Sequence, residues 1–197
     1  MGYVENKSGF SKIKKAIVIE NDRPQSEESY RIFTTKWLKA TAPHLHYKNA
    51  FYIFNSDKMI FALRDALKTC GFNLSQLLIW VKNNQVVGRK DYLVKHELIV
   101  YGWYGVHEFL KSKDKSVIFY PKPMSSPFHP TSKPVGLIRH LILNSTRIGD
   151  VVYDPFGGSG STLLACEQTK RICITVEIDP SYCATIISRS KKLKGEI

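Results

Sequence analysis

The sequence has no apolar run approaching the roughly 20 residues that a membrane-spanning helix needs. Residues 1–15 also lack the apolar segment of a secretory signal. The sequence therefore predicts a cytoplasmic protein with no membrane partner. With 43% hydrophobic residues in a chain of 197, an ordinary core can form, which excludes the disordered and collagen-like classes.

Cysteine and acidic residues are both scarce. The cysteines form no Cys-x-x-Cys pair and match no Cys/His spacing of a zinc site, so we expect buried thiols and no metal. These cysteines are Cys70, Cys166, Cys173 and Cys183. The 17 acidic residues face 29 Lys and Arg, which gives a net charge of +12. Such an excess favours an anionic partner, and nucleic acid is the simplest one.

Proline is concentrated in one stretch that divides the chain. Five of the nine prolines lie in residues 121–134, and because each fixes φ and removes a hydrogen-bond donor, this stretch is predicted to be an irregular linker. Residues 1–25 are polar and basic with little periodicity, which predicts a flexible lead-in loop. The remaining units are residues 26–120 and 135–197.

Apolar spacing predicts an α/β protein. Helices are expected from Ser26 to the residue before Pro43, and over residues 57–70, 135–144, 161–169 and 180–194. Strands are expected at Ala50–Phe54, Leu77–Val81, Leu98–Tyr101, Val117–Tyr120, Val151–Asp154 and Ile172–Glu177. The last unit therefore contains a strand, a helix and a second strand, which is the order of a βαβ unit.

A glycine-rich turn joins that strand to its helix. Glycines at 157, 158 and 160 let the backbone approach a ligand, and the N–H groups of the new helix point at it. Glu177 lies 17 residues beyond Gly160, where an acid in a Rossmann-like unit accepts hydrogen bonds from a ribose. The turn matches neither the NTPase phosphate loop nor GxGxxG. Asp154 would repel phosphate and suits a cationic ligand such as S-adenosylmethionine; a tight turn with a solvated Glu177 is the structural alternative.

These residues resemble the amino-group DNA methyltransferases that modify adenine N6 or cytosine N4, in the circularly permuted subgroup. The cofactor motifs of that family resemble Asp154–Thr162 (DPFGGSGST), Glu177–Asp179 and His129–Pro134 (HPTSKP). Its target-facing strands and loop resemble Leu78–Asn83, Gly88–Tyr92, His96–Glu97 and Tyr101–Trp103. The resemblance covers residues 50–189, in the family's order.

The resemblance implies a Rossmann-like S-adenosylmethionine-dependent methyltransferase sheet with helices on both faces. It also implies that residues 26–120 face the target base and DNA, and that residues 135–197 bind the cofactor. The implied cofactor-binding residues are His129, Thr131, Lys133, Asp154, Phe156, Gly157, Gly158, Gly160, Thr162, Glu177 and Asp179, although Asp179 could instead hold the loop. The implied DNA-binding residues, which would contact phosphates of double-stranded DNA, are Lys82, Arg89, Lys90, Tyr92 and Lys95, with a solvated basic face as the alternative.

The family's catalytic tetrapeptide, [D/S/N]-P-P-[Y/F/W], is absent from this sequence. In the permuted order it would lie just before Met1, so we expect a fold that lacks one or two central strands and no catalytic residue in this chain. A truncated gene, a second polypeptide that supplies the strand and an omitted N-terminus are all compatible with this pattern. The predicted function is a DNA methyltransferase of a restriction-modification or prophage system. The alternatives are a catalytically silent DNA-binding or partner-binding module, and an RNA or small-molecule methyltransferase.

Overall fold

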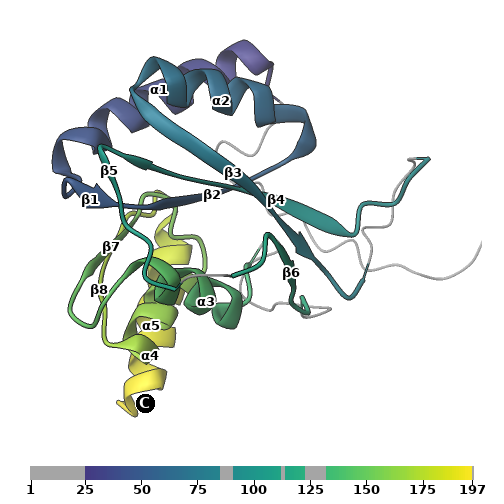
Figure 1. The fold of residues 1–197 in the computed structure, drawn as a ribbon. Helices are drawn as coiled ribbons and strands as arrows, with labels where there is room; N and C mark the ends of the chain where they lie inside the picture. The colour runs from purple at the N-terminus through teal and green to yellow at the C-terminus, as the bar shows by residue number, and fades with distance from the viewer. Residues whose placement is uncertain (1–24, 85–90, 112–113, 123–131, 197) are drawn as a thin grey trace, which may run out of the picture.

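The computed structural model describes residues 25–84, 91–111, 114–122 and 132–196. Two parts follow each other along the chain, and Figure 1 shows them as an upper and a lower body. The first part comprises α1 (Glu27–Thr41), η1 (Ala42–His44), β1 (Lys48–Asn49), β2 (Phe51–Asn55), η2 (Asp57–Met59), α2 (Ile60–Thr69), β3 (Phe72–Val81), β4 (His96–Tyr104), β5 (Val106–His107) and β6 (Val117–Phe119). The second part comprises α3 (Val135–Ser145), β7 (Val151–Asp154), α4 (Ser161–Thr169), β8 (Ile172–Thr175) and α5 (Pro180–Lys194).

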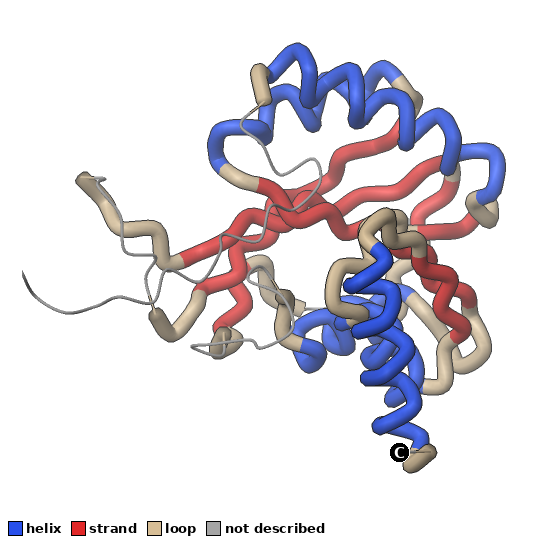
Figure 2. Tube along the Cα trace, turned by 180° about the vertical axis from the view of Figure 1, so that it is seen from behind, coloured by secondary structure: helices blue, strands red, loops and turns tan. Residues whose placement is uncertain are grey.

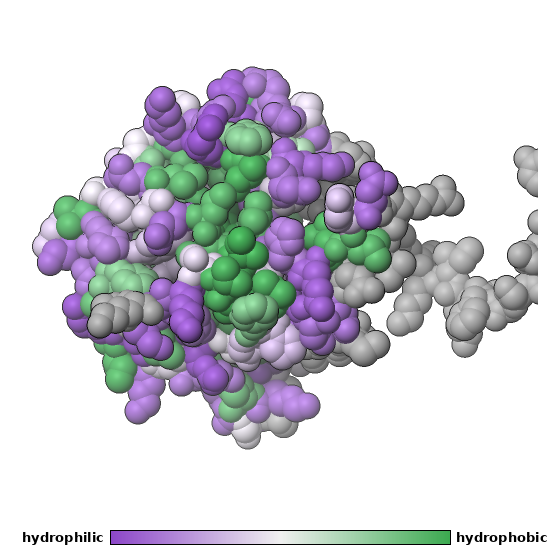
Figure 3. Space-filling view, turned by 45° about the vertical axis from the view of Figure 1, so that its right-hand side comes forward, coloured by the Kyte–Doolittle hydropathy of each residue, from purple (hydrophilic) through white to green (hydrophobic). Residues whose placement is uncertain are grey.

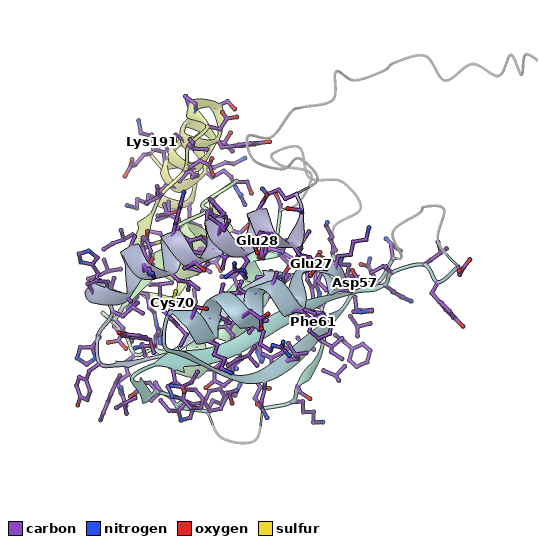
Figure 4. The ribbon with its side chains drawn as sticks, turned by 90° about the horizontal axis from the view of Figure 1, so that it is seen from above. Glu27, Glu28, Asp57, Phe61, Cys70 and Lys191 are labelled. Atoms are coloured by element: carbon purple, nitrogen blue, oxygen red, sulfur yellow. The ribbon has the colours of Figure 1, made fainter. Side chains whose placement is uncertain are left out.

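The helix ends follow local sequence. Ser26 caps α1 by accepting a hydrogen bond from the N–H of Ser29 at 3.1 Å, and two glutamates occupy the first turn, where they suit the helix dipole. Gly71, with φ of 77°, follows α2 in the left-handed conformation that glycine adopts without steric cost. Figure 4 shows α1 and α2 side by side over the sheet, with Glu27, Glu28 and Asp57 near the ends where the two helices begin.

The larger sheet has the strand order β2-β4-β3-β6. Strand β4 runs antiparallel to β2 and β3, and β6 runs parallel to β3. The prediction for β3 was too short, because the strand begins at Phe72 and passes through a bulge between Leu74 and Gln76 that interrupts the apolar alternation. The two-residue strands β1 and β5, which pair in parallel, were not predicted.

Helices cover both faces of this sheet. Leu38 of α1 and Leu63 and Leu67 of α2 pack with Val100 on one face. On the other face, Leu137 and Leu141 of α3 pack with Trp80 and Ile99. The predicted α/β class with helices on both faces is therefore confirmed.

Helix α3 also supports the second sheet. Its side chains Ile138 and Ile142 pack with Ala165 and Cys166 of α4, and Val152 of β7 lies against the same cluster. Two neighbouring faces of one helix thus hold the β2-β4-β3-β6 sheet and the β7-β8 pair. Figure 2 shows this arrangement from behind.

Strands β7 and β8 pair in parallel across α4, as predicted for a βαβ unit. Among the described residues, this pair has no hydrogen-bonded neighbour in the larger sheet. One of its faces is open: the large apolar side chains Val151, Tyr153, Ile172, Ile174 and Val176 are each more than two-fifths exposed. Figure 3 shows a band of apolar surface on one side of the molecule, bordered by hydrophilic residues.

None of the described helices is long and apolar enough to span a membrane. The four cysteines are all free thiols. Cys166 is buried as predicted, whereas Cys70, Cys173 and Cys183 are half-buried.

Gly102 of β4 is expected to tolerate no side chain. A Cβ there would collide with the backbone carbonyl oxygen of Asn73 and lie 2.6 Å from Cζ of Phe51, and strand pairing prevents the carbonyl from moving away. We expect Gly102→Ala to lower the free energy of unfolding by about 3 kcal/mol, the upper end for overpacking. Urea unfolding measures this, with Ser75→Ala on the exposed side of β3 as the control. Equal stability of the two variants would contradict the expectation.

Candidate functional site

The glycine turn begins at the end of β7 with Asp154, whose carboxylate is held by two donors. Its Oδ1 accepts a hydrogen bond from the N–H of Phe156 at 3.0 Å, and its Oδ2 accepts one from the Thr162 hydroxyl at 2.5 Å. Asp154 therefore fixes the turn to the first residues of α4. The predicted cofactor residues Asp154, Phe156 and Thr162 lie together.

Backbone conformation and steric crowding explain why the turn carries glycines. Gly160 has φ of 82° directly before α4, a conformation that side chains disfavour. A Cβ on Gly157 would lie 2.5 Å from Oγ1 of Thr175 and 3.2 Å from Cδ1 of Ile186 on α5. The turn is therefore packed closely between β8 and α5, where a side chain at position 157 would collide with Thr175.

Glu177 lies opposite this turn, where the sequence placed it. Its Oε2 accepts a hydrogen bond from the N–H of Gly158 at 2.6 Å, and its Oε1 accepts one from the N–H of Asp179 at 2.9 Å. A carboxylate offers about four lone-pair sites. After these two bonds, Glu177 retains acceptor capacity for the hydroxyls of a ligand beside the turn.

Asp179 caps helix α5. It is the N-cap of α5, and its Oδ1 accepts hydrogen bonds from the N–H of Ser181 at 2.7 Å and the Ser181 hydroxyl at 2.6 Å. Of the two roles that the sequence left open, this geometry fits holding the loop.

The last residues of the predicted element at residues 129–134 lie against the turn. The hydroxyls of Ser132 and Ser159 are 2.8 Å apart, and the Ser161 hydroxyl donates to the carbonyl oxygen of Lys133 at 2.7 Å. His129 and Thr131 lie outside the described residues. The backbone of Lys133 therefore reaches the turn.

The Lys133 side chain points to Glu97 of β4. Its Nζ lies 3.2 Å from Oε2 of Glu97 and 5.3 Å from the centroid of the Phe54 ring. The other oxygen of Glu97, Oε1, lies 2.7 Å from Nζ of Lys82. One carboxylate on β4 thus bridges the end of β3 and the segment before α3.

The surroundings of this bridge are largely buried. The Lys82 side chain is only 5% exposed, and its Nζ lies 5.3 Å from the centroid of Trp80. Burial would raise the pKa of Glu97, but Lys133 and Lys82 outweigh it and hold the pKa below its ordinary value. Burial lowers the pKa of Lys122, Glu97 opposes this effect, and Lys82 and Lys133 add to it.

The lowered pKa of Glu97 predicts a pH dependence of stability. A carboxyl group whose folded pKa is depressed stabilises the fold above its unfolded pKa, near 4.5, and this stability is lost as pH falls through the folded value. We expect the urea midpoint to fall between neutral pH and pH values below 4.5, and to fall less in Glu97→Gln. If the urea midpoint falls equally with pH in the two proteins, the pH dependence comes from other carboxylates, such as Asp114, whose pKa is also lowered.

The predicted DNA-binding residues do not form one solvated row. Lys82 is buried in the Glu97 bridge, so the expectation of a solvated phosphate contact does not fit its position. Tyr92, 89% exposed, and Lys95 lie on the surface, lining a depression of about 520 Å³ with Asp57 and His96. Arg89 and Lys90 lie outside the described residues.

Two aromatic residues that lie beside the turn were not singled out by the sequence analysis. Phe33 and Trp37, four residues apart on α1, contact the ring of Phe156. Apolar spacing predicted the helix that carries them, and only the fold brings them to a turn that is more than 100 residues away in sequence. Within the described ranges, no group of three His, Cys, Asp or Glu side chains could hold a metal ion.

Comparison with known proteins gives a family match over most of the chain. The family model for N6 and N4 methyltransferases, described as DNA methylase, matches residues 10–188. The type II methyltransferase M.Cfr9I of Citrobacter freundii is 32% identical over 147 residues, which are 66% of this chain and 48% of that protein. M2.MboI of Moraxella bovis is 26% identical over 180 residues, 80% of this chain and 64% of that one. The chain thus spans half to two-thirds of these curated relatives.

Solved structures show the same arrangement of elements. The M1.HpyAVI–SAM complex matches with a TM-score of 0.72 and 27% identity, covering 84% of this chain and 85% of that one. The cytosine-N4-specific PvuII DNA methyltransferase matches with a TM-score of 0.73 over 85% of this chain and 74% of that one. At 19% identity, the second match concerns the fold alone.

Proposed function

Because the chain belongs to the N6/N4 DNA methylase family, we propose that it binds S-adenosylmethionine and forms the cofactor-binding part of a site-specific DNA methyltransferase that acts in the cytoplasm. The target would be adenine N6 or cytosine N4. The observation that carries this proposal is that the carboxylates of Asp154 and Glu177 both accept hydrogen bonds from backbone N–H groups of the glycine turn.

The residues present fit this cofactor. Glu177 would accept hydrogen bonds from the ribose hydroxyls with its remaining lone pairs, and the half-buried Asp154 would face the positively charged methionine end. Gly157 and Gly160 let the turn pack closely against Thr175 and Ile186, which sets the shape of the turn that would receive the cofactor. Bound there, S-adenosylmethionine supplies an activated methyl group. The remaining task of this part of the chain is to hold and orient it, since correct placement of reacting groups lowers the barrier.

The first part of the chain, residues 26–120, would face DNA. Lys95, with Arg89 and Lys90 from the predicted basic loop, would neutralise phosphates, and Tyr92 offers an exposed ring beside them. Contacts of this kind position the duplex without reading its sequence. Lys82 would act on this surface only indirectly, through Glu97.

We propose that the strand with the catalytic tetrapeptide is supplied by a second polypeptide and lies between β2 and β7. Among the described residues, β2 pairs with β4 alone and β7 with β8 alone, so each offers an unpaired edge. Phe54 of β2 and Val152 of β7 pack on the same cluster of α3. An unprotected strand edge pairs readily with another strand.

Calorimetric titration with S-adenosylmethionine, followed by tritiated-methyl transfer to mixed-sequence duplex DNA, tests the proposal. We expect the isolated chain to bind the cofactor without transferring methyl groups, and transfer to begin when a polypeptide carrying the tetrapeptide strand is added. Failure to bind S-adenosylmethionine would overturn the cofactor assignment. Transfer by the chain alone would overturn the role of the second polypeptide.

The absent tetrapeptide and the net charge of +12 favour one alternative, a catalytically silent DNA-binding module. For such a module, the logarithm of the DNA-binding constant would fall linearly with the logarithm of the salt concentration. S-adenosylmethionine would not change the slope of this line. Methyl transfer after addition of the second polypeptide would exclude it.

A further inference from the structure

Two of the four cysteines face each other between α4 and β8. Cys166 of α4 is fully buried, and Cys173 of β8 packs against the hydrophobic cluster to which Cys166 belongs. Cys173 stands beside Val152 of β7 in the strand register, and Val152 packs against the same cluster. Both cysteines therefore lie on the side of the β7-β8 pair that α4 covers.

The short connection between α4 and β8 holds these two positions opposite each other. It reverses direction at Lys170, the only residue other than glycine with a positive φ, 58°, in the part of the chain that the structure describes. The N–H of Lys170 donates to the carbonyl oxygen of Glu167 at 3.3 Å, and the N–H of Arg171 donates to that of Cys166 at 2.9 Å. The chain thus returns along α4 through one hydrogen-bonded turn, and Cys173 follows as the second residue of β8.

The two thiols also interact with each other. A hydrogen bond from the Cys173 thiol lowers the pKa of Cys166, burial opposes this effect, and the Arg171 guanidinium adds to the lowering. The same hydrogen bond, followed by burial, raises the pKa of Cys173. The first proton therefore leaves the pair more easily than the second. Since the thiolate is the nucleophile, the pair is more reactive than a single buried thiol.

The other two cysteines contact backbone oxygen atoms. The Cys70 thiol donates to the carbonyl oxygen of Thr35 at 3.6 Å, and the Cys183 thiol donates to that of Glu177 at 3.5 Å. Burial raises the pKa of Cys70, which makes its thiolate scarcer. These two cysteines therefore serve as internal controls for the pair.

We propose that Cys166 and Cys173 form a redox-sensitive pair that a small peroxide oxidises to a disulfide. This inference goes beyond the proposed function and does not depend on it. Proton transfer along the shared hydrogen bond places the thiolate on Cys173, which is half-buried and so within reach of an oxidant that cannot reach Cys166.

The reaction has two steps. The Cys173 thiolate attacks one oxygen of hydrogen peroxide, the O–O bond breaks, and the products are a sulfenic acid and hydroxide, which takes up the proton that the thiol gave up and becomes water. The Cys166 sulfur then attacks the sulfenic sulfur, the S–O bond breaks, the S–S bond forms, and the hydroxyl leaves with the Cys166 proton as a second water. The two sulfurs together lose two electrons, and the peroxide gains them.

Peptide mapping of the full chain after treatment with hydrogen peroxide tests the pair. Trypsin cleaves after Lys170 and Arg171, so the disulfide would join peptide 148–170 to peptide 172–189. The second peptide also contains Cys183. Fragmentation of the cross-linked peptide from the wild-type chain identifies which of its two cysteines carries the bond.

The double variant Cys70→Ser/Cys183→Ser, which retains only the proposed pair, makes the result unambiguous. We expect the same cross-linked peptide, its reversal by dithiothreitol, and a joint loss of both thiols' reactivity toward iodoacetamide in the unfolded chain. Because the bond closes a short loop, it should raise the midpoint of thermal unfolding by about 5 °C.

Cys173→Ser is the matched control, because it removes the half-buried thiol and keeps the buried one. We expect its Cys166 to stay reduced in peroxide and its unfolding midpoint to stay constant. Oxidation of Cys173 to a sulfinic acid while Cys166 remains free would overturn the proposal, as would a bond to Cys183 or a peptide map that peroxide leaves unchanged. A cross-link that lowers the midpoint would show that α4 and β8 are not placed for the bond. No readout involves S-adenosylmethionine, so each of these failures leaves the proposed function intact.

Discussion

Replacing Asp154 with alanine is expected to lower the affinity for S-adenosylmethionine about a hundredfold or more. The carboxylate holds the N–H of Phe156 and the hydroxyl of Thr162, and each hydrogen bond to a charged group is worth about 1.5–3 kcal/mol. The variant would lose these bonds, which fix the turn to α4, together with the negative charge that faces the cofactor. Isothermal titration calorimetry measures the change directly.

Two variants make the comparison specific. Asp150→Ala removes a carboxylate just before β7, where it accepts from the N–H of Arg147 at 2.7 Å, far from the turn. We expect its cofactor affinity to match that of the wild type. Asp154→Asn keeps the shape and part of the hydrogen bonding but removes the charge, so it should fall between the two. Unchanged affinity in Asp154→Ala would contradict the assignment of this turn.

Replacing Glu97 with alanine is expected to destabilise the fold by about 3–5 kcal/mol, the cost of breaking a buried ion pair from one side. The Lys82 ammonium would remain buried without its partner at 2.7 Å, and Lys133 would lose its partner at 3.2 Å. Urea unfolding at neutral pH and low salt measures the free energy of unfolding.

The matched control removes both charges. Replacing a buried pair with apolar residues of similar volume is often neutral, so Lys82→Met combined with Glu97→Leu should recover most of the loss. Glu108→Ala breaks the pair with Arg147, which is 65% exposed, and should cost less than about 1 kcal/mol. A Glu97→Ala variant no less stable than Glu108→Ala would show that the bridge does not hold Lys82 in place.

The second part of the chain could be predicted closely from sequence. Strand β7 and helices α4 and α5 have the predicted bounds, because local signals mark their ends: Gly160 opens α4 and Asp179 caps α5. Strand β8 ends at Thr175, two residues earlier than predicted. The positions of Asp154 and Glu177 beside the turn followed from spacing alone, while their binding roles stay predictions.

In the first part of the chain, the positions of the side chains depend more on contacts between distant segments than they do in the second part. Lys82 was grouped with the surface lysines of its loop, because a sequence does not reveal that Glu97, on the next strand, lies within 2.7 Å. The same holds for Lys133, whose backbone follows the expected motif while its side chain points to Glu97. Phe33 and Trp37 could be assigned to a helix face from their spacing, but not to the glycine turn.

The packing of α3 against two separate sheets makes its length a geometric constraint on the whole protein. Leu137 and Leu141 face one sheet while Ile138 and Ile142 face the other, so the helix sets the angle between the two surfaces. One residue inserted between Ile138 and Leu141 would rotate the following turn by about 100° and swap core positions for exposed ones. We therefore expect changes in the length of the linkers before and after α3 to be tolerated better than changes within the helix, because the helix fixes where one sheet stands relative to the other.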